Sequence, residues 1–168
     1  MTTYVAFDGD KDMWAYQYMR GWSRNNRIDF DLLDAHDLDN MTSRAKDENY
    51  VKGKLRERME KSKAFVLLVG ESTKYLHKYV GWEIELALDL GLPMIVVNLN
   101  KNAGMDRDRC PAKLRDECAV HIPFKLAAIS HALDNWPSRF RGLTAADKAH
   151  GARSYPNQLT SKWLAERE

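Results

Sequence analysis

A glutamate on the apolar face of a helix is the side chain in this sequence best suited to chemistry. The segment "YVGWEIELALDL" (residues 79–90) is typical of an amphipathic helix, and at 100° per residue Glu83 falls within its apolar arc. Glu85 and Asp89 fall on the opposite, hydrated side. The residues that share the arc with Glu83 are Val80, Ile84, Leu86, Ala87, Leu88, Leu90 and Gly91. The pattern therefore predicts that Glu83 points inward and Glu85 outward.

A carboxylate held against a core requires compensation, because burying it without a partner costs several kcal/mol. Glu83 lies in the first turns of its helix, where the helix dipole favours a negative charge by roughly 0.3 to 1 kcal/mol. The helix follows a buried strand, and open α/β sheets bind ligands at the carboxyl ends of their strands. Two interpretations stay open for Glu83: a structural ion pair with a nearby Lys or Arg, or an acid that acts on a ligand.

Two aromatic residues and an acidic loop are further candidates for ligand contacts. Tyr79 and Trp82 flank Glu83, where they either stack on a ligand or pack within the helix. The loop "DGDKD" (residues 8–12) follows the first expected strand, and Asp8 at the strand end is its better site candidate. Asp10 or Asp12 could instead cap the next helix.

The elements that must position these residues alternate along the chain. Hydrophobic patterning predicts strands over residues 3–7, 28–32, 64–69, 94–99 and 119–124. It predicts one helix that begins near Met13 and four further helices, over residues 49–61, 79–90, 111–118 and 125–136. This order favours a flavodoxin-like three-layer α/β sandwich with a central five-stranded parallel sheet in the order 2-1-3-4-5. We expect one domain over residues 1–168, with a core of about 1–136 and residues 137–168 as a C-terminal appendage on it.

Composition excludes several classes of protein. With 168 residues, 44% hydrophobic and 30% charged, the chain is typical of a globular protein, and its apolar runs are too short to cross a bilayer. The net charge of +2 comes from interspersed acids and bases, which does not favour nucleic acid as a partner. Neither Cys110 and Cys118 nor the histidines have metal-ligand spacing, and no leader precedes the first strand, so we expect a cytoplasmic protein without a metal site.

The run "VLLVGESTKYLHKYVGWEIELALDLG" resembles TIR-type domains. In that family a strand ends in a serine-containing loop, an aromatic residue opens the next helix, and a glutamate follows four residues later. Ser72, Tyr79 and Glu83 match this pattern, and the likeness is greatest to the ThsB-type TIR-like domains of the bacterial Thoeris anti-phage system. The commoner TIR pattern has Trp then Cys at the helix start, whereas this chain has Tyr79 and Val80 there. The resemblance covers about residues 3 to 100.

The resemblance implies an enzyme that cleaves the bond between nicotinamide and ribose in NAD and makes an ADP-ribose-derived signal. NAD would be the substrate, with no cofactor. Glu83 would be the catalytic residue, with Phe7, Asp8, Asp10, Ser72, Tyr79 and Trp82 as substrate contacts. It also implies a separate effector protein that receives the signal and leaves open a phage-derived trigger and a homo-oligomer.

Three other functions are alternatives to NAD cleavage. A phospho-receiver also has acids after its first strand, but Gly70 and Glu71 stand here where its phosphorylated aspartate would be. A nucleoside deoxyribosyltransferase-like enzyme shares the sheet and a glutamate at a glycosidic bond. A non-catalytic TIR-like interaction module is the main alternative to an enzyme.

Overall fold

The structure, a computed structural model, describes residues 2–25, 31–33 and 47–167. Its strands are β1 (Thr2–Ala6), β2 (Asp31–Leu33), β3 (Ser62–Val69), β4 (Met94–Asn98), β5 (Ala119–Pro123) and β6 (Arg153–Ser154). Its helices are α1 (Met13–Arg24), α2 (Glu48–Glu60), α3 (Val80–Asp89), α4 (Leu126–Gly142), α5 (Ala145–Lys148) and α6 (Asn157–Ala165). Two short 3-10 turns, η3 (Thr73–Tyr75) and η4 (Ala112–Leu114), lie in the connections after β3 and β4.

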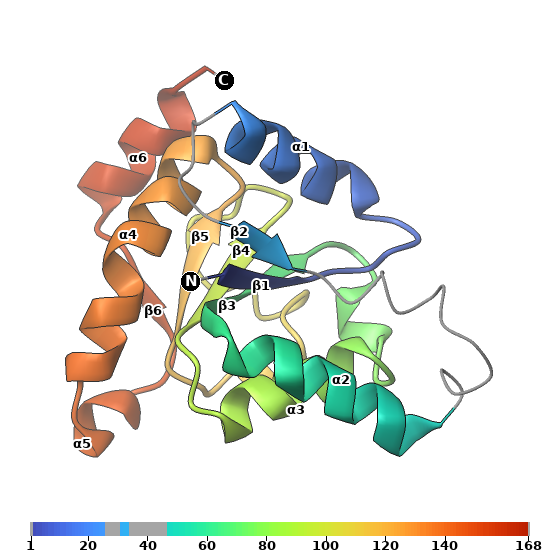
Figure 1. The fold of residues 1–168 in the computed structure, drawn as a ribbon. Helices are drawn as coiled ribbons and strands as arrows, with labels where there is room; N and C mark the ends of the chain where they lie inside the picture. Colours follow the sequence, from blue (N-terminus) through green and yellow to red (C-terminus); the bar gives the residue numbers. More distant parts are fainter. Residues whose placement is uncertain (1, 26–30, 34–46, 168) are drawn as a thin grey trace.

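One parallel sheet organises these elements (Figure 1). The strands run in the order β2-β1-β3-β4-β5-β6, so the sheet has six strands rather than the predicted five. The central strand β3 is buried along almost its whole length, as its continuous apolar sequence requires when both faces are covered. The predicted α/β class is confirmed.

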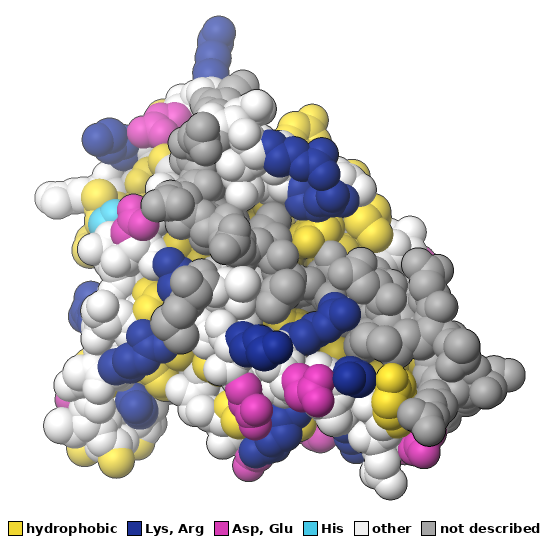
Figure 2. All heavy atoms as spheres, in the orientation of Figure 1, with side chains coloured by type: hydrophobic (Ala, Val, Ile, Leu, Met, Phe, Trp, Pro, Cys, Tyr) yellow, Lys and Arg dark blue, Asp and Glu magenta, His cyan; other side chains and the backbone are white. Residues whose placement is uncertain are grey.

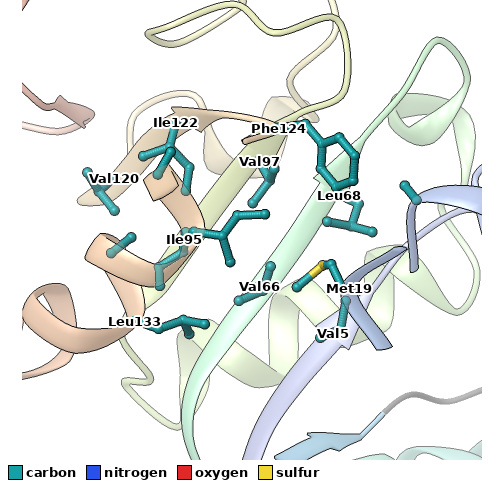
Figure 3. Close-up of a cluster of buried hydrophobic side chains, with 14 of the residues drawn as sticks. Val5, Met19, Val66, Leu68, Ile95, Val97, Val120, Ile122, Phe124 and Leu133 are labelled. Carbon is teal, nitrogen blue, oxygen red and sulfur yellow. The ribbon is translucent and has the colours of Figure 1, made fainter. Parts of the chain in front are cut away.

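Helices cover both faces of the sheet and separate two apolar clusters. Residues of α1, α4 and α6 pack with one face, and residues of α2 and α3 pack with the other. Figure 3 shows Met19 of α1 and Leu133 of α4 on the first face, close to side chains of β1, β3 and β4. On the second face, α2 presents Val51, Leu55 and Met59 to the sheet, at the four-residue spacing of one helix face. Acidic and basic side chains lie side by side over the region of α2 (Figure 2). On this helix Lys52 forms an ion pair with Glu48.

Three elements differ from the sequence predictions. The expected helix over residues 111–118 is wrong: only the turn η4 forms, because the chain enters β5 at Ala119, which must pair with Met94. The helix expected over residues 125–136 continues through Pro137 to Gly142. Residues 153–154, part of the expected appendage, pair with β5 as the sixth strand.

The structure describes the second predicted strand only in part. Only residues 31–33 of the expected strand are described, as β2, while Ile28 and Phe30 lie outside the described residues. No helix within the described ranges is long and apolar enough to cross a membrane.

Candidate active site

A cavity of about 500 Å³ opens near the carboxyl end of β1, beside the start of α3. Its wall comes from the acidic loop after β1, from Met13 at the start of α1, from residues 75–79, and from Val80 and Glu83 of α3. Two segments far apart in the sequence, residues 7–13 and 75–83, therefore meet at one end of the sheet, where parallel α/β folds bind ligands.

Glu83 is the most deeply buried acid of this cavity. Its side chain is only 3% exposed, and the hydroxyl of Tyr4, in the middle of β1, donates a hydrogen bond of 2.6 Å to its Oε2. Glu85 is exposed and forms an ion pair with Lys113, whose hydrogen bond lowers the pKa of the Glu85 carboxyl. The predicted opposite orientation of the two glutamates is confirmed, and a tyrosine hydroxyl is one partner of Glu83.

The backbone just before α3 brings Glu83 to the cavity. Tyr79 precedes the helix with a φ of 35° and a ψ of −75°, a conformation that a non-glycine residue rarely adopts. The Gly81 amide closes the turn by donating to the carbonyls of Leu76 and Lys78, and the Glu83 amide donates to the carbonyl of Tyr79. The sharp turn directs residues 75–79 across the cavity mouth, so that Tyr75 and Tyr79 form an exposed aromatic rim.

The acidic loop forms the opposite wall. Phe7, Asp8 and Asp10, three of the contacts that the TIR resemblance implies, all line the cavity. Asp8 is 4% exposed, and its Oδ1 accepts hydrogen bonds from the backbone amides of Asp10 (3.0 Å) and Lys11 (3.3 Å). The Asp8 carboxylate therefore holds the shape of its own loop, as short acidic side chains do in turns.

Asp12 lies behind this wall and has no capping role. It precedes α1, but its side chain makes no capping hydrogen bond, and its Oδ2 is buried without a partner among the described residues. Burial, followed by the negative charges of Asp8 and Glu71, raises the pKa of the Asp12 carboxyl.

Two predicted contacts are not among the residues that line the cavity. Ser72 immediately precedes η3 and is partly buried. Trp82 lies beside the rim, with its ring centroid 5.4 Å from that of Tyr79 and 4.9 Å from Nζ of Lys52. Trp82 also packs against the apolar cluster under α2 and α3, which fits the packing interpretation of this aromatic residue.

Sequence reasoning missed His77, Lys78 and Tyr75, which line the cavity, and Tyr4, which contacts Glu83. The first three lie between a strand end and a helix start, a position that could have marked them. For Tyr4, the only indication in the sequence was a polar hydroxyl within a strand expected to be buried.

The groups of this cavity can bind hydroxyls and stabilise positive charge. Its acids are Asp8, Asp10 and Glu83, while Lys78 can attract an anion at the rim.

Within the described ranges, no group of three or more His, Cys, Asp or Glu side chains could hold a metal ion. Cys110 and Cys118 are both buried and free, and burial raises the pKa of the Cys110 thiol to about 11.

A family model matches more than half of the chain. Residues 4–104 match the family model described as the TIR-like domain of the Thoeris protein ThsB. The match covers more than half of the chain and extends from β1 through β4, so it includes both walls of the cavity. No curated protein matches the chain.

Proposed function

The chain belongs to the family of ThsB TIR-like domains, which supports a TIR-type role in Thoeris defence, and we propose that it cleaves NAD between nicotinamide and ribose. One observation carries the proposal: Glu83, the glutamate that matches the TIR pattern, is a buried carboxylate in the wall of a cavity at the carboxyl end of the sheet. A buried acid in a ligand-sized cavity is typical of a catalytic group.

The chemistry requires one well-placed negative charge. The bond between C1′ of the ribose and N1 of the nicotinamide breaks, and its electron pair neutralises the pyridinium nitrogen. Nicotinamide thus leaves as a neutral base, and the ribose acquires oxocarbenium character. The Glu83 carboxylate stabilises that positive charge across the low-dielectric cavity. A water molecule, or a nucleophile of the same substrate, then bonds to C1′ and releases a proton to solvent.

The other predicted contacts take supporting roles in this proposal. Asp8 and Asp10 accept hydrogen bonds from hydroxyls of the substrate, and Phe7 and Tyr79 supply apolar and aromatic wall. Ser72 and Trp82 act at the loop and beside the rim, outside the cavity of the free protein. The product is an ADP-ribose-derived signal made in the cytoplasm for a separate effector protein, with a phage-derived trigger and a homo-oligomer as further parts of the proposal.

Nicotinamide release from NAD tests the proposal. The full chain and its Glu83→Gln variant are expressed in phage-infected and uninfected cells, and NAD and nicotinamide are followed in lysates and with purified protein. Glu85→Gln is the matched control, because it changes the same group two residues away on the exposed side of α3. We expect Glu83→Gln to lower release at least 100-fold, a range found when one charge-stabilising group is removed, and Glu85→Gln to retain activity.

Two results would contradict the proposal. Equal release by Glu83→Gln and wild type would remove Glu83 from the mechanism. No release by the wild type in infected cells would favour a TIR-like interaction module without catalysis.

A further inference from the structure

Tyr4 joins the centre of the sheet to the proposed catalytic glutamate. It lies in the middle of β1 and is 0% exposed, and its Cα pairs with Phe65 in the register of β1 with β3. The rings of Tyr4 and Phe65 stack with centroids 5.7 Å apart and an interplanar angle of 10°. A side chain fixed in this way has little freedom, so its hydroxyl is a stationary donor.

The contact between Tyr4 and Glu83 has the geometry of a strong hydrogen bond. The oxygen–oxygen distance of 2.6 Å falls in the range of about 2.5–2.7 Å that is typical when a hydroxyl donates to a carboxylate. Both side chains are buried, at 0% and 3% exposure. In a low-dielectric environment such a bond favours the charged form of the acid and fixes the plane of its carboxylate.

We propose that Tyr4 is a positioning residue for the reaction: its hydroxyl holds the Glu83 carboxylate ionised and correctly oriented toward the cavity. This inference rests on the proposed NAD cleavage. Tyr4 acts through Glu83, because its own side chain is fully buried and does not reach the cavity surface. The hydroxyl thereby supplies one polar partner for the inward carboxylate at the start of α3.

A positioning role predicts a particular pattern of kinetic changes. Removing the hydroxyl leaves substrate contacts in place, so KM should change less than about twofold, whereas kcat should fall about tenfold or more. Loss of a donor to the charged form also makes Glu83 easier to protonate. The acid limb of the pH–rate profile should therefore move up by about one to two pH units, since a hydrogen bond to a charged group is worth roughly that much.

Tyr4→Phe is the direct test, with Tyr155→Phe as the matched control. Tyr155 also has a buried hydroxyl, but that hydroxyl has no hydrogen-bond partner among the described residues and lies outside the cavity. Both variants of the full chain are assayed for nicotinamide release against NAD concentration and pH. The other titratable groups of the cavity wall are Asp8, Asp10, Tyr75, His77, Lys78 and Tyr79. All of them are retained in both variants, so a shift confined to Tyr4→Phe reports on Glu83.

A readout without catalysis separates this inference from the proposed function. The carboxyl carbon of Glu83 is observed by NMR in the free protein, assigned by its loss in Glu83→Gln, and titrated in wild type and Tyr4→Phe. We expect a higher titration midpoint in Tyr4→Phe. Replacement of Tyr4 by 3-fluorotyrosine, a more acidic donor of almost the same size, should move the midpoint the other way even if Tyr4→Phe folds poorly.

The outcomes test the positioning role of Tyr4 separately from NAD cleavage. An unchanged kcat in Tyr4→Phe, or a loss equal to that of Tyr155→Phe, overturns the positioning role while NAD cleavage stands. A wild type that releases no nicotinamide overturns NAD cleavage, and the titration alone then decides the role of Tyr4. Midpoints that are the same in wild type, Tyr4→Phe and the fluorotyrosine protein overturn it.

Discussion

The carboxylate of Asp12 lies directly against the backbone of Gly70. A Cβ atom built on Gly70 would be 2.4 Å from Oδ2 and 2.7 Å from Oδ1 of Asp12. Gly70 follows β3 and Asp12 precedes α1, so the missing side chain at residue 70 permits two loops of the sheet's carboxyl end to touch.

Gly70→Ala should therefore destabilise the fold. The new methyl group must displace a short, buried carboxylate, and overpacking of this kind typically costs about 1–3 kcal/mol. Urea unfolding measures the loss. In an Asp12→Ala background the clash is absent, so the same substitution should cost markedly less.

Gly53→Ala serves as the control for this prediction. Gly53 is an exposed residue of α2 with no atom within 4 Å of an added Cβ, so alanine there should stabilise by about 0.5–1 kcal/mol through helix propensity. Equal costs of Gly70→Ala with and without Asp12 would show that the contact does not limit residue 70.

Asp12→Asn should stabilise the protein at neutral pH. Burial and the nearby Asp8 and Glu71 raise the pKa of Asp12 in the folded state. An acid whose folded pKa is raised stabilises the fold at low pH and loses that contribution as pH rises through the folded pKa. Asparagine is neutral throughout, so its advantage over wild type should be largest at neutral pH and disappear below the unfolded pKa of aspartate. Urea unfolding of both proteins across this range measures the difference, and an advantage independent of pH would contradict the assignment to charge.

The periodicity of the sequence predicts which side of a helix a residue faces, because local helix geometry sets that orientation. Glu83 falls on the buried side of α3 because a 3.6-residue repeat places it there, and the structure agrees. Its partner Tyr4 is 79 residues away in the chain, so only the packing of α3 on the sheet brings them together. The turn before α3 escapes prediction because Tyr79 adopts a positive φ that sequence patterns reserve for glycine.

The predicted helix over residues 111–118 failed for a related reason. Cys110, Leu114 and Cys118 are spaced as on a helix and are all buried. Strand pairing at Ala119 nevertheless fixes the path of the chain, and the local pattern yields to it. The sequence thus predicts strands β1 to β5, most of the helices and the inward orientation of Glu83. It does not predict β6, the cavity rim or the contact of Tyr4 with Glu83, which depend on tertiary packing.

His121 should make the fold sensitive to mild acid. The side chain is 0% exposed in β5, both ring nitrogens lack hydrogen-bond partners in the described part of the chain, and burial lowers its pKa to about 4. The unfolded chain, with a pKa near 6.5, binds the proton first as the pH falls. Stability should therefore fall by about 1.4 kcal/mol per unit between these two values, or on the order of 3 kcal/mol in all.

A comparison of two histidine variants tests this assignment. His121→Val removes the titrating group from the strand and should flatten the pH dependence of urea unfolding between pH 6.5 and about 4. His77→Gln changes an exposed histidine and should leave the slope in place. A slope that persists in His121→Val would assign the acid sensitivity to other groups.

Removing only the Tyr4 hydroxyl should destabilise the protein more than replacing the polar groups of both Tyr4 and Glu83. Tyr4→Phe leaves the buried Glu83 without this donor, and a hydrogen bond to a charged group is worth about 1.5–3 kcal/mol. The double variant Tyr4→Phe, Glu83→Leu replaces both polar groups by apolar ones of similar size. Replacing both partners of a buried hydrogen bond costs less than removing one of them, so we expect the double variant to unfold at a higher urea concentration than Tyr4→Phe while releasing no nicotinamide. A double variant less stable than Tyr4→Phe would mean that Glu83 contributes to the fold through other contacts, and that its burial is structural in origin.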